Sequence, residues 1–177
     1  MFRRLRETGP GLLVPLAWTF AATAHEGLVA TRTVLIAHVV MCVLLAAFAV
    51  TSWRDMREGV LHAWLWVIVV GFGVTLLGAV SFLASEAFAA DTLAAMRATT
   101  VAGWMALPAV ALAYTGHETP TGERGWVYTA GGVCSALGLV VYLGGPVVAP
   151  ASAARLLGLG LAGLGQTAGI LLAVAES

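Results

Sequence analysis

Residues 33–53 read TVLIAHVVMCVLLAAFAVTSW, a run without any Asp, Glu, Lys or Arg. The hydrocarbon core of a bilayer is about 30 Å thick, and one helical crossing needs about 20 predominantly apolar residues. No water is present at that depth to satisfy an exposed backbone, so a helix is the structure that such a run can adopt there. The stretch therefore predicts a transmembrane helix.

Apolar stretches of similar length fill most of the remaining chain. The composition agrees, because 60% of the 177 residues are hydrophobic and 10% are charged, which leaves no room for a soluble domain beside the helices. We therefore predict an all-α, polytopic membrane helix bundle that forms a single domain over residues 1–177. Its six predicted transmembrane segments are 10–30, 33–53, 60–84, 94–114, 126–143 and 152–175.

The arginines predict the orientation of the bundle, since basic residues in short loops are retained on the cytoplasmic side. With both termini cytoplasmic, the inner ends carry most of the arginines and the outer ends carry few. Aromatic residues at the same helix ends agree with this assignment. The inner arginines are Arg3, Arg4, Arg6, Arg54, Arg57 and Arg124, against Arg32, Arg97 and Arg155 outside.

Residues 1–24 also fit a secretory signal peptide. Basic residues at the start precede an apolar stretch, and Ala22-Thr23-Ala24 matches a small-x-small cleavage site. Cleavage there would leave five transmembrane helices, whereas an uncleaved segment gives six.

The residue types that are missing restrict the chemistry. The chain has no lysine, which excludes a retinal or pyridoxal Schiff base and a phosphate-binding P-loop. No HExxH, GxSxG or Gly-rich nucleotide motif occurs, so no enzymatic activity is predicted. Cys42 and Cys134 form no CxxC pair and are interpreted as packing residues. The net charge of zero predicts no nucleic-acid partner.

The absence of lysine, together with the abundance of Ala, Val, Gly and Leu, is typical of a GC-rich genome. We therefore expect a multi-pass protein of a prokaryotic cytoplasmic (plasma) membrane, with the lipid bilayer as its surroundings.

Two segments resemble each other at an offset of 60 residues, either by duplication or by convergence in a simple apolar alphabet. Small residues recur in both at spacing i, i+4, i+7, on one helical face that lets backbones approach closely. These residues are Gly71, Thr75 and Gly78, and Gly131, Ser135 and Gly138.

The last segment carries a comparable stripe of small residues, Gly158, Ala162, Gly165 and Gly169. Such a stripe can join two copies or a larger membrane complex, or can pack within one chain. Gln166 lies beside it, and we expect this amide to face the bundle, because an unpaired polar group is costly in lipid.

The histidines are the candidate site residues. His25, Glu26 and His38 lie near the outer helix ends and form a candidate metal site, because imidazole and carboxylate groups bind transition metals. His25 with His38, and His62 with His117, are candidate axial ligands of two haem b groups. The alternative is that all four histidines are solvated at the membrane surface.

Two classes of function follow. The first is a non-enzymatic membrane protein, either a conduit for small solutes or ions or an accessory subunit of a membrane complex. The alternative is a redox subunit that binds haem b or copper through the outer histidines.

Overall fold

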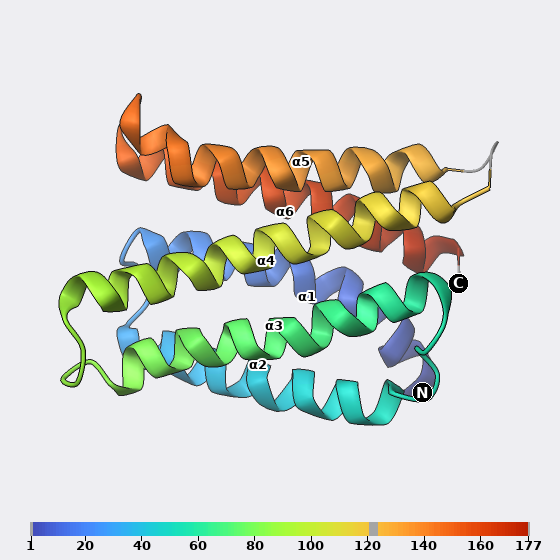
Figure 1. Ribbon diagram of the computed structural model, residues 1–177, viewed down its shortest axis with the longest axis horizontal. Helices are drawn as coiled ribbons and strands as arrows, with labels where there is room; N and C mark the ends of the chain where they lie inside the picture. Colours follow the sequence, from blue (N-terminus) through green and yellow to red (C-terminus); the bar gives the residue numbers. More distant parts are fainter. Residues whose placement is uncertain (1, 121–123, 177) are drawn as a thin grey trace. The chain divides into compact units, whose positions relative to one another are not determined.

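The computed structural model describes residues 2–120 and 124–176. This part of the chain is helical, with no strand among the described residues, and confirms the all-α class. It contains six α-helices and one short 3-10 helix, η1, and the α-helices are labelled in Figure 1. Their bounds are α1 Phe2–His25, α2 Thr31–Ser52, α3 Gly59–Leu83, α4 Ala90–Glu118, α5 Gly125–Gly144, η1 Gly145–Val147 and α6 Ala151–Glu176.

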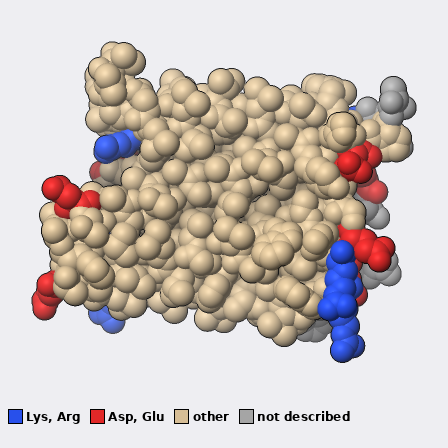
Figure 2. Space-filling model, in the orientation of Figure 1, with Lys and Arg blue, Asp and Glu red and all other residues tan. Residues whose placement is uncertain are grey.

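Five of the helices, α2 to α6, are long and apolar enough to cross a membrane. The most apolar is α2, with a mean hydropathy of 2.6. In α1 the apolar part is shorter and covers Gly11–His25, so a sixth crossing by α1 stays a prediction. On the face shown in Figure 2, charged side chains lie at the helix ends and the sides of the helices are uncharged. The chain therefore has the helices of a multi-pass membrane protein.

The chain divides into two compact units, each described here by itself. The central unit is Val29–Leu107 and holds α2, α3 and the first part of α4. The terminal unit combines Met1–Leu28 with Pro108–Ser177 and holds α1, the end of α4, α5 and α6. The division falls inside α4, at Pro108. The single-domain assignment stays a prediction.

Helix α1 ends earlier than the apolar pattern predicts, so the boundary at residue 30 is wrong. Gly27 has a φ of 70°, a left-handed conformation that glycine adopts without a steric penalty. The Leu28 N–H donates to the Thr23 carbonyl at 3.0 Å, and the Gly27 N–H donates to the Ala24 carbonyl at 3.1 Å. These two bonds form a Schellman motif, which satisfies the last carbonyls of a helix and stops it.

The α5–α6 pair in the terminal unit is held by backbone contact. A Cβ atom added to Gly138 would lie 2.6 Å from the Gly158 carbonyl oxygen, and one added to Gly131 would lie 2.5 Å from the Gly165 carbonyl oxygen. Gly169 faces Leu112 of α4. The small residues of α6 thus pack against helices of the same chain. Of the two predicted alternatives, this is packing within one chain.

In the central unit, the small-residue face of α3, with Gly71, Thr75 and Gly78, packs differently from the matching face of α5. Gly71 lies against the Trp104 ring, where an added Cβ would be 2.7 Å from the nearest ring carbon. The hydroxyls at the centre of the two faces nevertheless have the same role. Thr75 Oγ1 accepts a hydrogen bond from Trp104 Nε1 at 3.0 Å, and Ser135 Oγ accepts one from Gln166 Nε2 at 2.9 Å. Each hydroxyl therefore joins its helix to the next helix in the chain.

Candidate functional site

His38 lies on the side of α2 that faces α3. Its Nδ1 is 2.8 Å from the Val34 carbonyl oxygen of the preceding turn. A carbonyl only accepts, so in the neutral ring Nδ1 carries the proton and Nε2 carries the lone pair. The ring edge rests on Gly78, where an added Cβ would be 2.6 Å from His38 Nε2. The position of His38 therefore depends on the absence of a side chain at Gly78.

Phe82 lies between His38 and Arg97. The His38 and Phe82 ring centroids are 5.4 Å apart, and the Arg97 guanidinium carbon is 4.5 Å from the Phe82 centroid. Arg97 Nη2 also donates to the Ser81 carbonyl oxygen at 3.3 Å. The sequence predicts His38 and Arg97 at the same membrane level but misses Phe82. The available signal was its position four residues after Gly78, on the same face of α3.

His25 uses both ring nitrogens in the terminal unit. Nδ1 is 3.0 Å from the Ala21 carbonyl oxygen, and Nε2 is 2.9 Å from the Tyr142 hydroxyl. Because Nδ1 donates to the carbonyl, Nε2 of the neutral ring accepts from Tyr142. A metal or haem iron bound at Nε2 would have to replace this hydroxyl. Glu26 follows in the exposed turn after α1.

The other two histidines lie at helix ends. In the central unit, His62 Nε2 accepts a hydrogen bond from Trp66 Nε1 at 3.2 Å, one turn further along α3. In the terminal unit, His117 is exposed in the last turn of α4.

Both predicted histidine pairs take one member from each unit: His25 and His117 belong to the terminal unit, and His38 and His62 to the central unit. Neither pair is brought together within a unit. Among the described residues, no group of three or more His, Cys, Asp or Glu side chains could hold a metal ion. The haem pairs and the metal site of His25, Glu26 and His38 stay predictions.

Gln166 is the centre of a polar network in the terminal unit. Trp18 Nε1 donates to Gln166 Oε1 at 3.0 Å, and Gln166 Nε2 donates to Ser135 Oγ at 2.9 Å. Gln166 is 4% exposed, which confirms that its amide faces the bundle. Within the described residues, no buried side-chain nitrogen or oxygen lacks a hydrogen-bond partner. The network links α1, α5 and α6.

The threonine hydroxyls within the helices bond to carbonyls of their own helices. Thr75 donates to Gly71 at 2.8 Å, Thr100 to Met96 at 2.9 Å and Thr115 to Ala111 at 2.8 Å. Such back-bonding satisfies the hydroxyl locally. Two of these hydroxyls also reach a second helix, since Thr75 accepts from Trp104 and Thr100 donates to the Val74 carbonyl at 3.1 Å.

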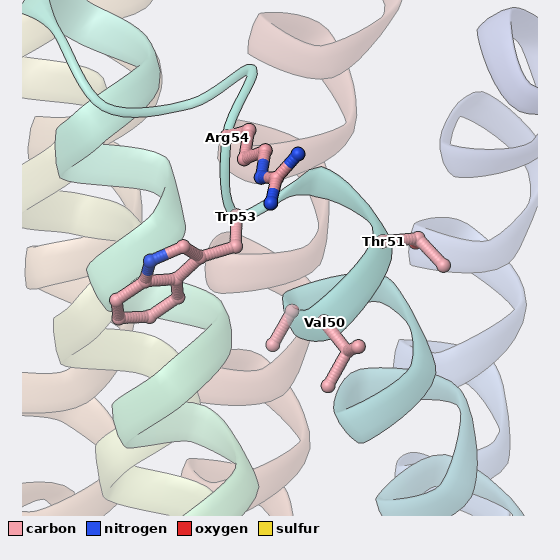
Figure 3. Close-up of a pocket in the computed structure, with 5 residues that line it drawn as sticks. Val50, Thr51, Trp53 and Arg54 are labelled. Atoms are coloured by element: carbon pink, nitrogen blue, oxygen red, sulfur yellow. The ribbon is translucent and has the colours of Figure 1, made fainter.

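Two hollows lie at the end of α2 and the start of α3, in the central unit, and the sequence did not reveal them. Figure 3 shows Val50, Thr51, Trp53 and Arg54 at the first hollow, which has a volume of about 400 Å³. The second hollow measures about 180 Å³, and Trp53 lines both. The second is also lined by Arg57, His62, Leu65, Trp66 and Val69.

Compared with protein-family models, with curated proteins and with solved structures, the chain matches none.

Proposed function

We propose that this protein is a non-catalytic accessory subunit of a larger membrane complex. It would sit in a prokaryotic cytoplasmic membrane with both termini in the cytoplasm. The observation that carries the proposal is the Gln166 network with Trp18 and Ser135. An intramembrane polar residue is by default a candidate for function. Here both ends of the amide bond to neighbouring helices, so the polar group supports helix packing.

The outward side of α2 is the surface that we propose for the partner. Ile36, Val40, Val43, Ala47 and Val50 are all exposed and follow one another at helical spacing. Val43 is 63% exposed and Val50 is 78% exposed, while the only buried residues of α2 are Leu45 and Ser52. This row has an apolar surface suited to a second transmembrane helix.

The arrangement gives less support to a conduit. A path for ions or polar solutes needs polar groups that face it, and the threonine hydroxyls of α3 and α4 are bonded to their own carbonyls. Neither hollow is lined by Thr75, Ser135 or Gln166.

Site-specific photo-crosslinking in native membranes tests the proposal. A photoreactive amino acid at Val43 should give one discrete cross-linked product, because this side chain is exposed. The same residue at the buried Leu45 is the matched control and should give no intermolecular product. The purified protein, reconstituted alone into vesicles, should pass no ions or small solutes.

Two results would contradict the accessory role. Flux through vesicles that contain only this protein, and that is lost when Gln166 is replaced, would establish a conduit. An oxidised and dithionite-reduced absorption spectrum with stoichiometric haem, or stoichiometric copper by metal analysis, would establish the redox alternative if the signal disappears in His25→Ala or His38→Ala.

A further inference from the structure

The second hollow follows one face of α3 from its polar start into its apolar part. His62, Leu65, Trp66 and Val69 line it, and their spacing of i, i+3, i+4 and i+7 places them along one side of the helix. At a rise of 1.5 Å per residue, His62 and Val69 are about 10 Å apart along the axis. Leu65 is 4% exposed. The hollow therefore changes from polar to apolar over about the depth from a lipid headgroup to its first chain carbons.

The charged side chains that line the two hollows are both arginines. The link between α2 and α3 contains Arg54, Asp55, Arg57 and Glu58. Arg54 lines the first hollow and Arg57 lines the second, whereas neither carboxylate lines either. A guanidinium presents several N–H donors in a planar fork that matches a phosphate group. The polar end of the second hollow thus favours an anion.

Trp66 determines which nitrogen of His62 can serve that anion. Indole Nε1–H is only a donor, so His62 Nε2 accepts its hydrogen bond, at 3.2 Å. The proton of the neutral imidazole is then on Nδ1, which becomes a donor available for a ligand. Trp53, which lines both hollows, and Trp66 are 45% and 54% exposed. Exposed indoles at helix ends are typical of the headgroup region.

We propose that the second hollow is a groove that binds one phospholipid with an anionic headgroup. The phosphate lies against the Arg57 guanidinium and His62 Nδ1, the glycerol region lies between Trp53 and Trp66, and an acyl chain follows Leu65 and Val69. Charge selects this occupant, since a neutral apolar helix would contact the apolar floor of the second hollow but would bring no anion to the Arg57 that lines it. The surrounding bilayer supplies the ligand.

Native mass spectrometry of the delipidated protein in mild detergent tests the proposal. The lipids are phosphatidylglycerol and phosphatidylcholine with identical acyl chains. We expect one phosphatidylglycerol to bind about tenfold more tightly than phosphatidylcholine, a difference of about 1.4 kcal/mol. Arg57→Gln should remove this preference. Arg32→Gln is the matched control, because it neutralises an exposed arginine at the other end of α2, and it should keep the preference.

A second variant tests the role of the indole. Trp66→Phe keeps an aromatic ring in the groove but removes the N–H that fixes the His62 tautomer, and should weaken phosphatidylglycerol binding about threefold while phosphatidylcholine binding is unchanged. Equal affinities for the two lipids in the wild-type protein would overturn the anionic assignment. If Arg57→Gln and Arg32→Gln lose the same amount of phosphatidylglycerol affinity, the preference is unspecific charge attraction and not binding at this site. Saturation by inorganic phosphate alone would show that the ligand is a free anion and not a lipid.

Discussion

Gly138→Ala tests whether backbone contact holds α5 to α6. The added Cβ would lie 2.6 Å from the Gly158 carbonyl oxygen and 2.8 Å from the Ala162 nitrogen. Both are backbone atoms, so no side chain can rotate away to make room. Ordinary van der Waals contact begins at 3.4 Å, and the two helices would have to separate locally by about 0.8 Å, the difference between 3.4 and 2.6 Å.

A separation of this size is energetically significant. A gap of about 0.5–1 Å loses about a quarter to a half of the dispersion energy of each contact, and overpacking of a well-packed interior typically costs about 1–3 kcal/mol. Against this, replacing glycine by alanine within a helix stabilises it by about 0.5–1 kcal/mol. We therefore expect Gly138→Ala to lower the free energy of unfolding by about 1–2 kcal/mol.

Equilibrium unfolding in mixed micelles of mild detergent and dodecyl sulfate, followed by helical circular dichroism, measures this change. Gly160→Ala is the matched control. It lies in α6, and apart from its chain neighbours and the backbone of its own helix no atom lies within 4 Å of its added Cβ, so this variant should be as stable as the wild-type protein or slightly more stable. If Gly138→Ala is as stable as Gly160→Ala, the close approach of α5 and α6 is not what holds them together.

Three further predictions concern the polar groups and the orientation. Gln166→Leu removes the hydrogen bonds of Gln166 with Trp18 and Ser135, and at about 0.6 kcal/mol for each bond in a membrane should lower the free energy of unfolding by at least about 1 kcal/mol. An unchanged free energy in the same micelle assay would contradict a stabilising network. His38→Ala should leave the absorption spectrum and metal content of the purified protein unchanged, and a chromophore lost on substitution would support the haem or copper alternative instead. In a background without native cysteines, Arg32→Cys should react with a membrane-impermeant maleimide on intact cells and Arg57→Cys only after lysis; the reverse pattern would invert the predicted orientation.

The sequence predicts the helices well because bilayer thickness fixes how long an apolar run must be. Its boundaries fail where local backbone chemistry decides. The pattern runs α1 on to residue 30, but Gly27 in the left-handed conformation ends the helix at His25. In α4, the predicted segment 94–114 is shorter than the observed Ala90–Glu118. Apolar length marks only the part within the membrane, while a helix can continue into polar residues.

The candidate site was less predictable, because it depends on which side chains meet. The spacing of Gly71, Thr75 and Gly78 predicts a face for close packing, and the structure shows that face in use. The spacing does not reveal which atoms cover the face. Aromatic rings cover it in α3, whereas the α6 backbone covers the equivalent face in α5. The sequence also did not reveal the second hollow, which Arg57 lines. This hollow forms only where the end of α2 and the start of α3 come together.

The terminal unit has a consequence for biosynthesis. The central unit is continuous in sequence and can assemble as soon as Leu107 has been made. By contrast, α1 contacts α6, and the amide partner of Trp18 is Gln166. Between His25 and Ala151 the ribosome adds about 126 residues, which takes about 6–25 s at 5–20 residues per second. During that interval the Trp18 indole needs another partner, such as lipid headgroups or a membrane chaperone.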